Sequence, residues 1–137
     1  MEPDIVVDSN VMRLYGAAHD PAFKAFFSWL RTAGVLACSQ KMLVEYSRTG
    51  SSLIAALLDE LLLASRFRKY SGDQIATIKQ RHYKFRSNYA DHVHVKLVMC
   101  TCRRLCLSQD DSLRYDVTHF PGFAAQAAAR PEDLPYR

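Results

Sequence analysis

Two apolar runs in the sequence each end on an acidic residue. The run IVV leads directly into Asp8, and the run at residues 104–107 leads through Ser108 to Asp110. If both runs are strands of one parallel sheet, their carboxyl ends lie at the same edge, which brings the two carboxylates together from distant parts of the chain. A turn or a helix cap is the alternative explanation of either aspartate taken alone.

Two more acids have apolar neighbours. Glu45 lies within MLVEY, in a segment that suits a helix packed on a core, and Asp91 stands just before the apolar residues 93–100. An exposed helix position would explain Glu45, and a helix N-cap would explain Asp91. The cap does not exclude a function, because a capping carboxylate can also bind a metal.

The chemistry of these four acids depends on whether they converge. Two carboxylates about 4 Å apart repel by about 1 kcal/mol in bulk water and by about 4 kcal/mol at an effective dielectric near 20. Converging carboxylates therefore either have raised pKa values or bind a cation. Oxygen ligands suit Mg²⁺ or Mn²⁺ rather than zinc, and we expect no cysteine or histidine in the set. Such an ion activates water and neutralises a phosphodiester during in-line attack, so no catalytic histidine is needed.

Strands and helices alternate along the chain, which predicts an α/β fold. We expect strands at residues 4–7, 35–38, 66–70 and 104–107, and helices at residues 10–15, 41–48, 71–86 and 123–129. The spacing of apolar residues predicts two further amphipathic helices, one between Asp20 and Gly34 and one after Ser52. The second of these carries a stripe made of Leu53, Ile54, Leu57, Leu58, Leu61 and Leu62. Short strands separated by helices favour a parallel sheet that is covered on both faces.

Composition limits the class of protein. The 137 residues correspond to about one domain, and contents of 49% hydrophobic and 23% charged residues suit a globular chain. No apolar run reaches the roughly 18 residues of a membrane span, and the N-terminus lacks a signal region, so we expect a soluble cytoplasmic protein. A net charge of +4 permits an anionic partner without demonstrating one. The four cysteines lack a CxxC motif and are expected to be small buried side chains.

Four segments follow one another in an order that a known family shares. IVVDSNV matches an opening strand with an Asp-Ser/Thr-Asn signature, KMLVEYSR a middle acid, and NYADHVHVKLV an acid that begins the helix before a late strand. RLCLSQDDSL matches an apolar strand followed by Ser/Thr-x-Asp and by an apolar residue three positions further on. In these segments, over nearly its whole length, the chain resembles the PIN domain family, small metal-dependent nucleases that include the toxins of VapBC-type toxin–antitoxin pairs.

The resemblance implies a fold and an activity. The fold is a three-layer α/β/α sandwich around a central, mainly parallel sheet, with one PIN-like domain over residues 1–137. The activity is that of a hydrolase, a metal-dependent endoribonuclease that cleaves RNA with Mg²⁺ or Mn²⁺. The residues that would hold the metal and catalyse cleavage are Asp8, Glu45, Asp91 and Asp110. An antitoxin protein and a homodimer are the partners that the resemblance implies.

The residues beside the first and last acids would support them. By the same resemblance, Asn10 and Ser108 would hold these acids by hydrogen bonds. Asp111 competes with Asp110 for the fourth place. We choose Asp110 because it lies two residues after Ser108 and three before Leu113.

Basic and aromatic residues are interleaved in RHYKFR, which suits contact with unpaired nucleotides. We predict that Arg81, Lys84 and Arg86 contact RNA, although a solvated helix face is the alternative. His92 and His94, beside Asp91, are candidates for substrate contact and not for catalysis. The competing hypothesis for the whole chain is a catalytically inactive PIN-like module that binds RNA or a protein.

Overall fold

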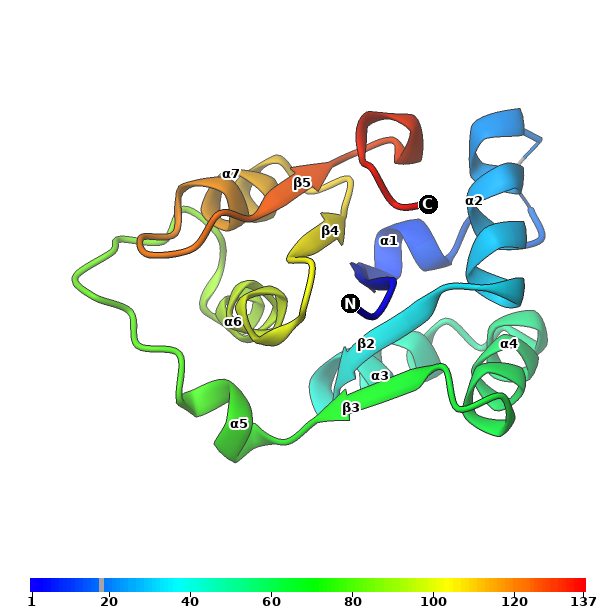
Figure 1. Ribbon diagram of the computed structural model, residues 1–137, viewed down its shortest axis with the longest axis horizontal. Coiled ribbons are helices and arrows are strands. Elements are labelled where there is room, and N and C mark those ends of the chain that lie inside the picture. The colour runs from blue at the N-terminus through cyan, green and yellow to red at the C-terminus, as the bar shows by residue number, and fades with distance from the viewer. Residues whose placement is uncertain (18) are drawn as a thin grey trace.

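Five parallel strands form the central sheet of the molecule (Figure 1). The computed structural model describes residues 1–17 and 19–137. The strands are β1 (Asp4–Val7), β2 (Val35–Ser39), β3 (Phe67–Tyr70), β4 (Leu105–Leu107) and β5 (Gln126–Ala128), in the spatial order β3-β2-β1-β4-β5. Because every neighbouring pair is parallel, all carboxyl ends lie at one edge of the sheet.

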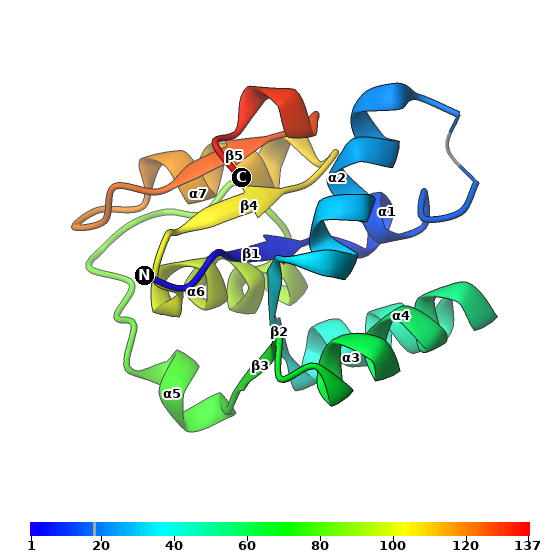
Figure 2. The same cartoon turned by 45° about the vertical axis from the view of Figure 1, so that its right-hand side comes forward.

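Helices cover both faces of this sheet. In the described residues they are α1 (Ser9–Met12), α2 (Pro21–Thr32), α3 (Gln40–Arg48), α4 (Ser52–Leu63), α5 (Gly72–Ala76), α6 (His92–Cys100) and α7 (Asp111–His119), with short 3₁₀ turns η1 (Tyr89–Asp91) and η2 (Pro131–Asp133). Figure 2 shows α6 and α7 on one side of the strands and α2 and α4 on the other, and contacts between α6 and α7 and between α2 and α4 agree with this. The predicted α/β/α sandwich with a parallel sheet is therefore confirmed. No helix of the described residues has the length and apolarity to cross a membrane.

The amphipathic helices bury the faces that their spacing predicts, with one difference. Asp20 caps α2 through a hydrogen bond from the Ala22 N–H, and the helix buries Phe23, Phe26, Phe27 and Leu30. Helix α4 buries Ile54, Leu57 and Leu61. Leu53 and Leu62, predicted in the same stripe, are 53% and 62% exposed. Helix α4 packs on α2, α3 and β3 at one flank of the molecule, so the width of its buried face is smaller than the width of its apolar stripe.

The prediction of one helix over residues 71–86 is wrong. Only α5 forms, with a capping box at Ser71, and the chain then runs irregularly to η1. Arg81 and His82 have φ angles of 53° and 64°, which a right-handed helix does not accommodate. The backbone N–H groups of Arg86 and Ser87 donate to the buried carboxylate of Asp116. A tertiary partner thus replaces the helical hydrogen bonds of this segment.

The prediction of a helix at residues 123–129 is also wrong, because residues in this segment form β5. Alanine favours helices, but pairing with the open side of β4 satisfies the backbone here. The Ser108 N–H donates to the Ala128 carbonyl at 3.0 Å, and the Gln126 N–H donates to the Arg104 carbonyl at 2.9 Å.

The cysteines fit their prediction only in part. All four are free thiols, and Cys38 and Cys106 are buried. Cys100 is partly buried and Cys102 is exposed, because the chain leaves α6 there and turns at the surface towards β4.

Candidate functional site

The topology directs the four predicted acids towards one edge of the sheet. Asp8 follows β1 and Asp110 follows β4, and these two strands are neighbours. Helix α3, which starts directly after β2, carries Glu45. Helix α6 must return the chain to the start of β4, so its first turn, which follows Asp91, lies at the edge where the strands end.

Ser108 joins the first acid to the last. Its hydroxyl donates to Asp8 Oδ2 at 2.7 Å and accepts from the Asp110 N–H at 3.1 Å. Asp8 Oδ1 accepts from the Ser9 N–H at 2.8 Å, so both oxygens of this buried carboxylate are fixed. The predicted supporting role of Ser108 agrees with these contacts.

Asn10 makes a second bridge between the same two segments. Its Nδ2 donates to Asp8 Oδ2 at 3.2 Å, and its Oδ1 accepts from the Gln109 N–H at 3.1 Å. Asp110 begins α7, with Oδ1 accepting from the N–H groups of Ser112 and Leu113 at 2.9 and 3.1 Å. The capping explanation of Asp110 is thus correct for one oxygen, and Oδ2 has no hydrogen bond within the described residues.

Glu45, Asp91 and His94 form a tight group beside this pair. One ligand atom from each lies within 4.8 Å of the others. His94 Nε2 is 2.8 Å from Glu45 Oε2 and 3.9 Å from Asp91 Oδ1. The Ser9 hydroxyl donates to Glu45 Oε1 at 3.3 Å and so connects this group to the strand end at Asp8.

The electrostatics of Asp91 indicate that all four carboxylates share one neighbourhood. Burial raises the pKa of Asp91, and the charges of Asp8, Asp110 and Glu45 raise it further against the opposite effect of His94. Asp91 stands at the N-cap position of α6, yet its side chain makes no capping hydrogen bond, so the capping explanation does not account for this carboxylate.

The pKa of Glu45 shifts in the opposite direction from that of Asp91. Burial alone raises the pKa of Glu45, but the hydrogen bond and charge of His94, the hydrogen bond of Ser9 and the charge of Lys41 outweigh it. The pKa of Glu45 therefore lies below its usual value. The expectation that no histidine lies within the acid set is wrong, since His94 is in direct contact with Glu45. The spacing of Asp91 and His94, three residues apart at the start of a helix, could have predicted that they share a face.

Asp111, the alternative fourth acid, has a different environment. Its side chain is 91% exposed and forms an ion pair with Arg114. Arg114 in turn donates to the Ser108 carbonyl at 2.8 Å, which ties the exposed pair to the end of β4. The charge of Asp110 raises the pKa of Asp91, so Asp110 stays the candidate for the fourth place.

The donor set fits a small divalent cation. Oxygens of Glu45 and Asp91 lie within 4.8 Å of each other and of a His94 nitrogen, and the like charges that act on Asp91 make a cation there favourable. The imidazole of His94 is also compatible with Mn²⁺, which accepts nitrogen ligands more readily than Mg²⁺ does.

The predicted RNA contacts lie on the irregular segment between α5 and η1, which leads to Asp91. Arg81, Lys84 and Arg86 are all exposed. The Arg86 guanidinium stacks 3.4 Å from the centre of the Tyr115 ring.

A pocket of about 460 Å³ lies on the side of α5, and its wall includes Ala90 and His92, the chain neighbours of Asp91. Lys41 and Lys96, both half-buried, line it together with the exposed ring of Tyr89. Neither lysine has a carboxylate within ion-pair distance in the part of the chain that the structure describes. Sequence reasoning missed this pocket because its residues come from four separate elements, α3, α5, η1 and α6.

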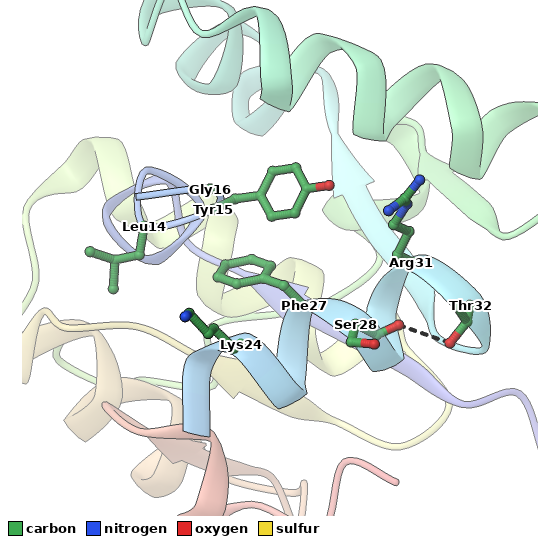
Figure 3. Close-up of a pocket in the computed structure, with 8 residues that line it drawn as sticks. All are labelled: Leu14, Tyr15, Gly16, Lys24, Phe27, Ser28, Arg31 and Thr32. Carbon is green, nitrogen blue, oxygen red and sulfur yellow. Dashed lines mark hydrogen bonds between the residues drawn. The ribbon is translucent and has the colours of Figure 1, made fainter. Parts of the chain in front are cut away.

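Other concave and acidic places do not contain the predicted residues. A pocket of about 300 Å³ lies between the turn that follows α1 and helix α2, and Figure 3 shows Tyr15, Lys24 and Phe27 in its wall. Glu2, Asp4 and Cys102 also lie close together, at the amino end of β1. Buried Asp4 accepts from the Cys102 and Arg103 N–H groups at 2.8 and 3.0 Å, so it secures the connection from α6 to β4.

Comparisons with known proteins support the fold. No protein-family model and no curated protein matches the chain. Among solved structures, a chain in the crystal structure of VapBC2 from Rickettsia felis bound to a DNA fragment from their promoter is similar, with a TM-score of 0.50 and 12% sequence identity. The match covers 91% of this chain and 97% of that chain. Identity this low speaks for the fold alone, and that fold is the PIN-like α/β/α sandwich that the sequence predicts.

Proposed function

We propose that this chain is a divalent-metal-dependent endoribonuclease that hydrolyses RNA phosphodiester bonds, and that it is the toxin of a toxin–antitoxin pair. The observation that carries this proposal is that acids from separate elements lie at one edge of the sheet: Ser108 joins Asp8 to the Asp110 N–H, and Ser9 joins the end of β1 to Glu45, which lies beside Asp91. The similar fold within the VapBC2 complex supports the toxin part.

In this proposal Asp8, Glu45, Asp91 and Asp110 hold Mg²⁺ or Mn²⁺. A bound ion supplies Lewis acidity, which neutralises charge on the phosphodiester and activates water for in-line attack. The chain's own contribution is to orient the oxygens before substrate arrives. Ser108 and Asn10 fix Asp8, and Ser9 and His94 fix Glu45.

The basic residues around the acids suit a polyanionic substrate. Lys41 and Lys96 supply positive charge in the adjoining pocket, where phosphates on one side of the scissile bond would lie. The exposed ring of Tyr89 can stack on an unpaired base. Arg81, Lys84 and Arg86 would then contact the RNA further along the same segment.

The partner part of the proposal comprises an antitoxin and a second copy of the chain. Leu62 and Leu63 at the end of α4 are exposed, which suits an apolar contact with another protein chain. Light scattering in solution measures the homodimer, and a gene for a small antitoxin next to this one tests the toxin role.

The nuclease part is tested by incubating the protein with RNA and Mn²⁺ and comparing the wild type with Asp8→Asn. We expect cleavage to fall by at least about 100-fold, beyond the range for loss of a supporting hydrogen bond. Asp111→Asn is the matched control, because it removes an exposed acid close by. It should cleave like the wild type. Equal cleavage by Asp8→Asn and the wild type would rule out this site.

The same experiment separates the competing hypothesis. A catalytically inactive module would bind RNA, and bind Mn²⁺ if its acids are intact, without producing fragments at any metal concentration. Binding without cleavage would therefore favour the RNA- or protein-binding module over the enzyme.

A further inference from the structure

His94 stands out among the residues near the acids. It lies on α6 between apolar residues of the core, and its side chain is 1% exposed. One ring nitrogen, Nε2, faces Glu45 and Asp91. The other, Nδ1, is buried and has no hydrogen-bond partner within the described residues.

A half-satisfied imidazole is an unfavourable residue in a core. The buried Nδ1 gives up the hydrogen bond that it makes with water in the unfolded chain, and an apolar side chain of similar size would avoid this loss. Nothing on the Nδ1 side compensates in the described structure. The polar contacts of the ring are all on the Nε2 side, so the chemistry of this residue is directed at the acids.

The distances on that side suit shared coordination of one ion. Two ligand atoms of one ion lie at most about 4.2 Å apart, twice an ion–ligand distance of about 2.1 Å. The distances from Nε2 to Glu45 Oε2 and Asp91 Oδ1 are 2.8 and 3.9 Å, both within that limit, and the two acids have oxygens within 4.8 Å of each other, close enough for small side-chain movements to complete the site. The three groups come from α3, the end of η1 and α6, so the fold brings them together rather than one local turn.

We propose that His94 is itself a ligand of the cation site, through Nε2, and that it makes the site prefer Mn²⁺ to Mg²⁺. The proposal rests on the proposed function, since it concerns the same site. Mg²⁺ takes oxygen ligands almost exclusively, whereas an imidazole nitrogen is a good ligand for Mn²⁺ and later transition metals. In the ligating form the ring is neutral and its single proton lies on Nδ1.

The alternative role for His94 is to donate a hydrogen bond from Nε2 to Glu45 and to act on the ion only through that carboxylate. The two roles make different demands on the side chain. Donation needs an N–H at this position, which the amide of glutamine supplies. Ligation needs a nitrogen lone pair, which the amide does not supply.

The experiment measures metal binding without RNA. Mn²⁺ and Mg²⁺ are titrated calorimetrically into the wild type, His94→Gln and His94→Leu, and pulsed electron paramagnetic resonance of the Mn²⁺-loaded proteins detects nitrogen coupling. His119→Leu is the matched control, an exposed histidine on α7. Denaturant unfolding checks that each variant folds, and His94→Leu should stay folded, because it removes the unpartnered nitrogen together with the hydrogen bond to Glu45.

We expect an imidazole nitrogen coupling in the wild type and in His119→Leu that both His94 variants lack. Mn²⁺ affinity should fall by about 10- to 100-fold in both variants, while Mg²⁺ affinity changes by less than about threefold. Retention of wild-type Mn²⁺ affinity by His94→Gln overturns ligation in favour of donation. Mn²⁺ binding to the wild type without nitrogen coupling overturns this proposal alone, whereas no binding of either ion overturns the proposed metal site as well.

Discussion

The buried carboxylate of Asp116 fixes the segment that carries Asp91, and its replacement by asparagine should weaken both the fold and the site. Asp116 is fully buried and accepts four hydrogen bonds. Oδ1 accepts from the Tyr83 hydroxyl at 2.8 Å and the Arg86 N–H at 2.9 Å. Oδ2 accepts from the Ser87 N–H at 2.8 Å and the Ser87 hydroxyl at 2.6 Å.

The cost of Asp116→Asn follows from the number of oxygens. An amide has one acceptor oxygen, and its NH₂ group must face either the Ser87 N–H or the Arg86 N–H, whichever way it turns. One buried backbone N–H is therefore left without its partner, and the remaining bonds are no longer made to a charged group. A bond to a charged group contributes about 1.5–3 kcal/mol and an unsatisfied buried group costs about 1–3 kcal/mol, so we expect the free energy of unfolding to fall by about 2–4 kcal/mol at pH 7.

The effect should depend on pH. Burial raises the pKa of Asp116, but the hydrogen bonds from Arg86, Ser87 and Tyr83 outweigh it, so the pKa in the folded state lies below 3.8. A lowered folded pKa stabilises the fold above the unfolded pKa of about 3.9, and that contribution disappears as pH falls through the folded value. The difference in stability between the wild type and Asp116→Asn should thus be constant from pH 7 to 5 and shrink below about pH 4.

Urea unfolding followed by the fluorescence of Trp29 measures both effects. Asp59→Asn, an exposed acid on α4, is the matched control and should change stability by less than about 0.5 kcal/mol. Asp116→Asn should also reduce RNA cleavage, because Asp91 follows the loosened segment. Equal stability of the two variants at pH 7, or a deficit that stays constant down to pH 3, would refute the assignment of these hydrogen bonds.

Two further predictions concern the site. Ser108→Ala removes the hydroxyl that joins Asp8 to the Asp110 N–H, and we expect metal affinity measured by calorimetry to fall by about 10- to 100-fold with little change in secondary structure; unchanged affinity would show that the bridge is unimportant for binding. Joint replacement of Lys41 and Lys96 by alanine should weaken RNA binding, which is measured without metal so that no cleavage occurs. The slope of log affinity against log salt should become shallower by about 0.7 for each phosphate that the two lysines neutralise in the wild type. Lys24→Ala, in the pocket of Figure 3, is the control, and an equal effect from it would place the RNA elsewhere.

The sequence predicts well those parts of the fold in which the local residue pattern matches the burial of the segment in the folded chain. β1 is an uninterrupted buried run, and the period of Phe23, Phe26, Phe27 and Leu30 equals that of the helix face they form. Asp8 and Asp110 could be paired in advance because strand direction alone puts them at one edge. No detail of side-chain packing is needed for these inferences.

The parts that the sequence predicts poorly are decided by partners far along the chain. Residues 126–128 would suit a helix by composition, but β4 offers them an open strand edge. Residues 77–88 have no regular structure because Asp116 accepts the hydrogen bonds that would otherwise require a helix. Neither partner can be identified from the local sequence.

His94 combines a feature that the sequence predicts with one that a distant partner decides. Its position three residues after Asp91 is visible in the sequence, but its distance to Glu45 depends on how α6 and α3, from the two faces of the sheet, meet at the edge where the strands end. The family resemblance predicts the four acids, whereas the contact of His94 with Glu45 is found only in the folded chain. The metal preference that we propose for the site therefore depends on the tertiary structure, and the resemblance alone could not predict it.

The fold holds the acids together against their repulsion. Asp8 and Glu45 are fixed by groups from neighbouring segments: Ser108 binds Asp8, and His94 and Ser9 bind Glu45. If these bonds were absent, the side chains could rotate away from one another and lower their electrostatic energy. Burial, together with the charges of Asp8, Asp110 and Glu45, raises the pKa of Asp91, so its ionised form is disfavoured in the folded chain when no cation is bound. A cation that binds only the folded state would favour that ionised form, so ion binding and stability are coupled at this site.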